Sequence, residues 1–133
     1  AVRVRELVVA TIKPEITAKQ NEINVYKALA GAGFSTIEFN KPGNDDKTDV
    51  VIGCHAVGDW GHGSGPSIAF FSPVQLTYTV KPTNLLSIEL FAYTALPEWE
   101  GKKLRIPLED DAVVTTRGVE WVYPINQRVQ PIK

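Results

Sequence analysis

The chain has 133 residues, of which 44% are hydrophobic and 22% are charged, as expected for one globular domain. Its formal net charge of −1 gives no global positive field that would attract nucleic acid or an anionic membrane. The single cysteine, Cys54, excludes an internal disulfide framework. No apolar run approaches the length of a membrane span, so we expect a soluble domain. The sequence does not indicate its cellular compartment.

The first 30 residues are predicted to form a strand and then one helix. β-branched residues dominate residues 2–12, which favours a strand. Pro14 suits the first turn of a helix, because the N–H that proline lacks would have no partner there. Apolar residues at helical spacing follow it, and Gly31 ends the segment. We therefore expect an amphipathic helix over about residues 14–30, packed on a sheet.

The remainder of the chain is predicted to be rich in β-structure. Apolar runs and alternating patterns predict strands at residues 35–39, 49–57, 67–71, 74–80, 85–96, 103–108, 112–116 and 119–123. Four glycines within residues 58–66 predict a loop. The expected fold is α+β and β-rich, with a mainly antiparallel, sandwich- or barrel-like sheet. It forms one domain over residues 1–123, followed by an extended arm at 124–133.

Side chains suited to chemistry gather near the middle of the sequence. Zinc accepts the ligand types found at Cys54, His55, Asp59 and His62. Adjacent strand residues point to opposite faces, so Cys54 and His55 are not expected to bind one ion. A serine nucleophile elbow needs glycines two positions to either side, which Ser64 lacks. We therefore predict no catalytic residue, no metal site and no cofactor, with a small hydrolase using Cys54 and His62 as a third-ranked alternative.

Two tryptophans in predicted loops indicate a candidate binding surface. Trp60 lies in the glycine-rich segment and Trp99 in a turn. Loop tryptophans can stack on a sugar or anchor a protein interface. The candidate binding residues are therefore Asp59, Trp60, His62 and Trp99, and the second-ranked function is a carbohydrate or small-ligand binding domain that uses the loop at 58–66.

The favoured hypothesis is a non-catalytic structural subunit that associates with itself or with neighbouring subunits. A virion or filament component, such as a coat, decoration or connector protein, is one concrete form. Near-neutral charge, a β-rich fold and the lack of polar side chains spaced to converge motivate this interpretation. A neighbouring subunit could also take the arm at 124–133 as an extra strand.

Overall fold

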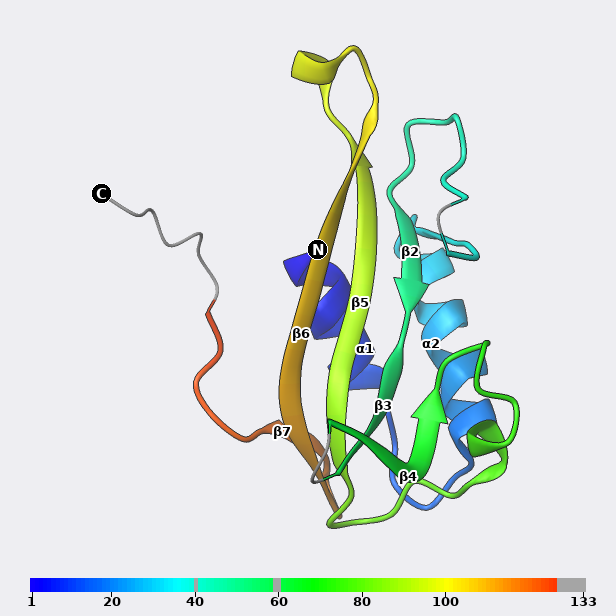
Figure 1. The fold of residues 1–133 in the computed structure, drawn as a ribbon, viewed down its shortest axis with the longest axis vertical. Coiled ribbons are helices and arrows are strands. Elements are labelled where there is room, and N and C mark those ends of the chain that lie inside the picture. The colour runs from blue at the N-terminus through cyan, green and yellow to red at the C-terminus, as the bar shows by residue number, and fades with distance from the viewer. Residues whose placement is uncertain (40, 59–60, 127–133) are drawn as a thin grey trace.

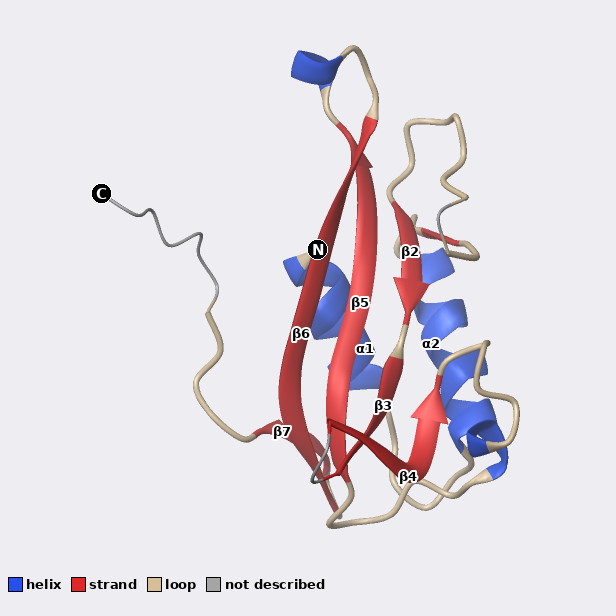
Figure 2. Cartoon of the chain, viewed as in Figure 1, coloured by secondary structure: helices blue, strands red, loops and turns tan. Residues whose placement is uncertain are grey.

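A computed structural model of the chain describes residues 1–39, 41–58 and 61–126. These residues form two α-helices, two short 3₁₀ helices and one seven-stranded sheet. Both α-helices lie against the same face of the sheet (Figures 1 and 2). The predicted α+β, β-rich class is confirmed. The sheet is mixed, because one strand pair is parallel, and it is open rather than closed into a barrel or doubled into a sandwich.

The first helix, α1 (Val2–Thr11), occupies the segment predicted to be a strand. Val4, Val8 and Ile12 recur at a spacing of four residues and are fully buried in the core. β-branched residues disfavour a helix only slightly, so burial of this apolar stripe outweighs their preference for strands. The strand prediction was therefore wrong. Among the described residues, no helix is long and apolar enough to cross a membrane.

The second helix, α2 (Ala18–Gly31), begins four residues later than predicted. Thr17 caps it, because the threonine hydroxyl accepts a hydrogen bond from a backbone N–H of the first turn at 3.1 Å. The side chain of Asn21 accepts from the N–H of Lys13 and donates to the Lys13 carbonyl. This clamp fixes the linker between the helices, so Pro14 lies before α2 rather than in its first turn.

The strands place residues from distant parts of the sequence side by side. They are β1 (Ser35–Thr36), β2 (Asp49–Ile52), β3 (Cys54–Gly58), β4 (Gly61–Ile68), β5 (Leu85–Ala95), β6 (Lys103–Thr115) and β7 (Gly118–Trp121). The central strand β5 pairs with β6 on one side and with β2 and then β3 on the other. β4 pairs with β3 and β7 pairs with β6, both antiparallel, and β1 pairs in parallel with β2.

Further strand predictions need correction, beginning with 49–57, which is divided at Gly53 into β2 and β3. The two strands expected at 103–108 and 112–116 are one continuous strand, β6. The segment 74–80, whose alternation predicted a strand, contains the 3₁₀ helix η1 (Gln75–Thr77). A second 3₁₀ helix, η2 (Pro97–Trp99), lies in the connection between β5 and β6.

Alternation along β5 divides the sheet into an apolar face and an open face. Leu86, Ile88 and Leu90 point toward the helices and are buried in the main core. Because successive strand side chains point in opposite directions, Ser87 and Glu89 lie on the open face. This open face carries the candidate site.

The strand β4 was predicted to be a loop because of its glycines. A Cβ atom added at Gly65 would lie 2.8 Å from the Cβ of Ala56, and one added at Gly63 would lie 3.0 Å from the Val57 carbonyl. Glycine at these positions therefore allows β3 and β4 to approach closely. The pairing places His62 opposite Val57, beside the residues of β3.

The close approach at Gly65 leads to a stability prediction. We expect Gly65→Ala to lower the free energy of unfolding by about 1–3 kcal/mol, since the new methyl group overlaps Ala56. Gly31, the last residue of α2, is a matched control because nothing lies within 4 Å of its added Cβ. Urea denaturation should show little loss for Gly31→Ala. Equal losses in the two variants would contradict the packing explanation.

Candidate metal centre

Four strands bring two histidines and two glutamates together on the open face of the sheet. They are His55 from β3, His62 from β4, Glu89 from β5 and Glu109 from β6. The register of β5 and β6 places Glu89 directly opposite Glu109. Like charges directly opposite each other on neighbouring strands destabilise a sheet. This pairing therefore favours the presence of a compensating positive charge.

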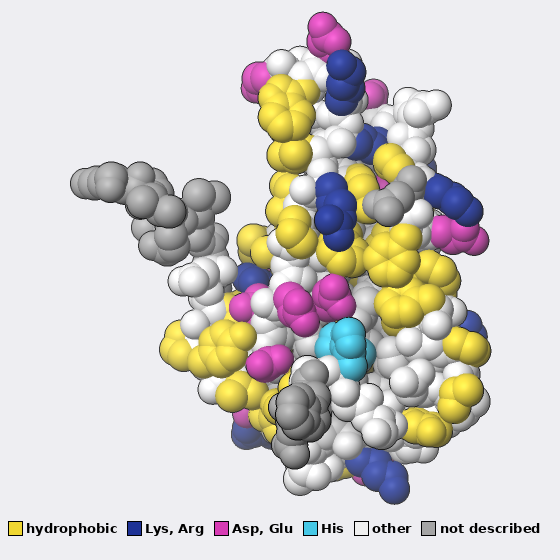
Figure 3. Space-filling model, in the orientation of Figure 1, with side chains coloured by type: hydrophobic (Ala, Val, Ile, Leu, Met, Phe, Trp, Pro, Cys, Tyr) yellow, Lys and Arg dark blue, Asp and Glu magenta, His cyan; other side chains and the backbone are white. Residues whose placement is uncertain are grey.

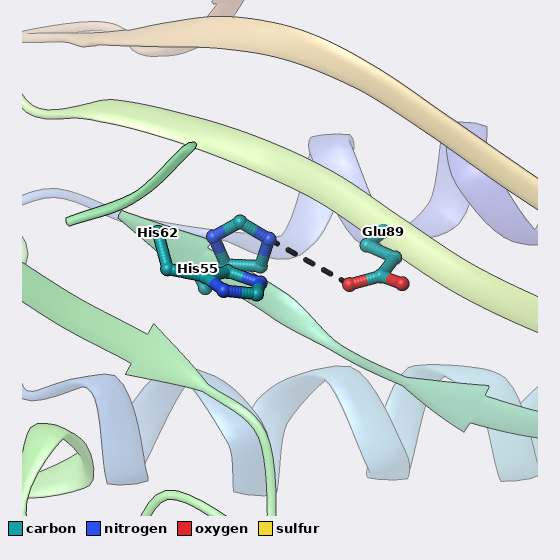
Figure 4. A group of neighbouring side chains, drawn as sticks. All are labelled: His55, His62 and Glu89. Atoms are coloured by element: carbon teal, nitrogen blue, oxygen red, sulfur yellow. Dashed lines mark ion pairs between the residues drawn. The ribbon is translucent and has the colours of Figure 1, made fainter. Parts of the chain in front are cut away.

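The distances between these groups are those of a small cation site. Nε2 of His55 lies 3.6 Å from Oε2 of Glu89 and 3.7 Å from Oε1 of Glu109. Potential ligand atoms of His55, His62 and Glu89 all lie within 4.8 Å of one another. Figure 4 shows the two imidazole rings close together, with the carboxylate of Glu89 directed toward them. Ligands lie about 2.0–2.2 Å from a zinc ion, so these atoms surround a space that one ion fits.

The hydrogen bonding of His55 leaves one ring nitrogen available to a metal. Nδ1 lies 3.0 Å from the carbonyl oxygen of Ala56, which can only accept a hydrogen bond, so Nδ1 carries the proton. In the neutral ring the lone pair is then on Nε2. This atom is buried and has no hydrogen-bond partner among the described residues. A backbone carbonyl that fixes the tautomer in this way is typical of metal-binding histidines.

Burial and mutual repulsion of the two glutamates outweigh the nearby positive groups at Glu89. Burial raises the pKa of Glu89 above its usual range, and the negative charge of Glu109 raises it further. The hydroxyl of Ser87 donates a hydrogen bond of 2.8 Å to Oε1 of Glu109, which orients that carboxylate. A cation bound between the carboxylates would offset both the burial and the repulsion.

The raised pKa of Glu89 predicts a stability gain when its charge is removed. Above the folded-state pKa, the ionised carboxylate opposes folding, and this cost disappears as the pH falls through that pKa. We therefore expect Glu89→Gln to raise the thermal midpoint of the metal-free chain at pH 7, with a smaller gain at pH 4. Thermal unfolding in EDTA measures this difference. Glu98→Gln, at an exposed site, is the control, and a lowered midpoint for Glu89→Gln at pH 7 would contradict the prediction.

A cavity of about 240 Å³ opens beside the histidines. In Figure 3 the histidine surface lies between acidic side chains on one side and hydrophobic side chains on the other. The residues that line the cavity are His55, His62, Gly63, Ser67, Phe71, Ser72, Gln75 and Glu89. The candidate metal centre is therefore accessible to a ligand.

Cys54 takes no part in this site. The structure confirms that Cys54 and His55 point to opposite faces, since Cys54 is fully buried in the core beneath the sheet. Burial raises the pKa of the Cys54 thiol to about 12, so it stays protonated at neutral pH. A thiolate pair with His62 is therefore not available.

Of the four predicted binding residues, the structure describes His62 and Trp99, and it brings His62 to the site. His62 lies in the candidate metal centre. Trp99 is exposed in η2, beyond the far end of β5. Asp59 and Trp60 lie outside the described residues, as does most of the predicted arm, residues 127–133.

Glu89 and Glu109 were not predicted as site residues from the sequence. A signal was present at Glu89, which is a single charged residue within a long apolar strand. A role for Glu89 in a site becomes clear only from the strand register, because the pairing of β5 with β6 shows that Glu109 lies opposite it. The prediction of no metal site considered only residues 54–62.

Comparison with solved structures shows the fold. An X-Pro aminopeptidase from Thermotoga maritima aligns with a TM-score of 0.60 and 17% identity, over 96% of this chain and 30% of that one. A prolidase from Pyrococcus horikoshii aligns with a TM-score of 0.55 and 21% identity, over 90% of this chain and 28% of that one. The chain thus spans less than a third of either peptidase. No family model and no curated protein matches the sequence.

These comparisons overturn the favoured functional hypothesis. The chain shares its fold with parts of peptidases, so the prediction of a virion or filament subunit was wrong. That hypothesis depended on the claim that no polar side chains converge, and the sheet register brings together residues from four strands. Self-association stays a prediction.

Proposed function

We propose that this chain is a metal-binding domain of a peptidase-type hydrolase, with His55, His62 and Glu89 as the principal ligands and Glu109 beside them. The buried, unpartnered Nε2 of His55, which faces two carboxylates, is the observation that carries the proposal. Three groups with available lone pairs surround one space. A cation or a proton between them would stabilise this arrangement.

The ligand types favour a divalent transition metal such as Zn²⁺ or Mn²⁺. Imidazole with carboxylate oxygens suits these ions, whereas a site made only of oxygen ligands would favour Ca²⁺ or Mg²⁺. A metal bound here would act as a Lewis acid toward a peptide carbonyl. His62 is exposed, and its ring centroid lies 4.2 Å from that of His55. It is therefore placed to complete the ligand set or to exchange a proton with a bound substrate.

The fold of the two peptidases supports hydrolysis of a peptide bond as the reaction class. Fold alone does not define a reaction. The proposal therefore depends on the metal centre, and the fold indicates only which class of reaction to test. Because the chain spans less than a third of each peptidase, complete activity is proposed for a site to which further residues contribute.

Two measurements test this proposal separately. Equilibrium dialysis with Zn²⁺ or Mn²⁺ should show one ion per chain, with a rise in the thermal midpoint on binding. The metal-loaded chain, alone or with added peptidase fragments that supply the further residues, should then release amino acids from dipeptides, including X-Pro dipeptides, and His62→Ala should reduce that release. Absence of metal binding would refute the metal centre. Binding without hydrolysis by the chain alone or with added peptidase fragments would refute the hydrolytic role.

A further inference from the structure

Three phenylalanines form an exposed cluster beside the candidate metal centre, which we name the aromatic patch. Phe39, Phe70 and Phe71 are 36%, 37% and 47% exposed. The ring of Phe71 lies 5.0 Å from that of Phe39 and 5.2 Å from that of Phe70, measured between centroids. Aromatic rings at these distances stabilise one another, so the patch is a continuous apolar surface.

The aromatic patch is anchored to the open face of the sheet. Phe39 lies 5.6 Å from the ring of Phe91, which is buried on β5 with Val51 and Tyr93. The exposed rings therefore rest on a packed layer. Their position is fixed by the same strand that carries Glu89.

The patch is continuous with the cavity of the metal centre. Phe71 lines that cavity together with His55, His62 and Glu89. Acidic side chains flank the histidines on one side, and hydrophobic side chains occupy the other (Figure 3). A molecule bound at the histidines therefore meets an apolar wall in one direction.

We propose that the aromatic patch receives a bulky apolar side chain of the peptide bound at the metal, from a residue that adjoins the bond to be cleaved. This inference rests on the proposed function and adds a substrate class to it. The cavity of about 240 Å³ suits one side chain with its peptide group. Typical pockets for whole small molecules are about 300–1,000 Å³.

The polar residues around the cavity fit a peptide backbone. Ser72 and Gln75 line it, and both side chains can donate or accept hydrogen bonds. Phe71 is the large apolar side chain among the residues that line the cavity, so selection by side-chain size and shape would depend on it.

Paired hydroxamates provide a direct test, because they bind a metal and differ only in the side chain. The chain is loaded with Zn²⁺ and titrated by calorimetry with phenylalanine hydroxamate and with glycine hydroxamate. We expect the benzyl compound to bind about tenfold more tightly, since its ring is removed from water by the aromatic patch. Phe71→Ala should abolish most of this preference. Phe71→Leu should keep part of it, and Trp99→Ala, at the far end of β5, should leave it unchanged.

The possible results separate the two proposals. Failure to bind Zn²⁺ would refute the metal centre and this inference together. Zn²⁺ binding with equal affinity for the two hydroxamates, or a preference that survives Phe71→Ala, would refute the substrate class alone. A dimer that Phe71→Ala dissociates, measured by light scattering, would also refute it, because a second copy would then cover the patch.

Discussion

Replacing His55 with alanine is expected to weaken Zn²⁺ binding by at least about 100-fold. Loss of a partner that only orients a ligand typically costs about 10–100-fold in metal affinity, so loss of the ligand itself should cost at least as much. The effect is large because His55 supplies a buried nitrogen that faces both carboxylates. Competition with a chromophoric chelator measures the affinity.

The neighbouring residue provides a matched control for this prediction. Cys54 lies on the opposite face of the same strand, and we expect Cys54→Ala to leave Zn²⁺ affinity unchanged even if it lowers stability. The control also separates the present site from one that includes sulfur. If Cys54→Ala weakened binding as much as His55→Ala, the ligand assignment would be wrong.

Asp110→Ala is expected to destabilise the folded chain by about 3–5 kcal/mol, the usual cost of leaving one member of a buried ion pair alone. The guanidinium of Arg5 contacts the Asp110 carboxylate at 2.5 Å, and only 2% of the Arg5 side chain is exposed. Its other contacts are weaker, a hydrogen bond of 3.3 Å to the carbonyl of Asn126 and a position 5.6 Å from the ring of Trp121. Chemical denaturation of the metal-free protein measures the loss.

The adjacent aspartate distinguishes loss of this ion pair from loss of any charge on β6. Asp111 lies on the opposite face of β6 from Asp110, and we expect Asp111→Ala to change stability by less than about 1 kcal/mol. An Asp110→Ala variant as stable as Asp111→Ala would show that Arg5 finds another partner or reaches solvent.

The sequence predicted the fold best where one periodicity was unambiguous. The strand expected at 85–96 is β5 almost residue for residue, since its alternation separates a core face from an open face. The strand prediction for residues 2–12 was wrong because β-branched side chains favour strands locally. In the fold, Val4 and Val8 are buried at helical spacing. The loop prediction for β4 was wrong because its glycines serve close packing against Ala56. That contact exists only in the folded chain and cannot be read from local sequence.

The candidate site was predictable only in part. Zinc ligand types at His55 and His62 were recognised, as was the divergence of Cys54 from His55. The two glutamates were not recognised, because Glu89 and Glu109 lie 20 residues apart in the sequence and become neighbours only through the register of β5 and β6. Register depends on the hydrophobic pattern together with turn geometry, and no turn that would pair these two strands was predicted from the sequence.

Anomalous diffraction from crystals soaked in Zn²⁺ would test the metal centre most directly. We expect one strong peak about 2.0–2.2 Å from Nε2 of His55 and from a carboxylate oxygen of Glu89, with Glu109 within reach. The absence of a peak at these atoms after soaking in excess Zn²⁺, or a principal peak elsewhere on the chain, would contradict the assignment. The contact between His55 and Glu89 would then be an ordinary ion pair, with a proton rather than a metal ion between the two groups.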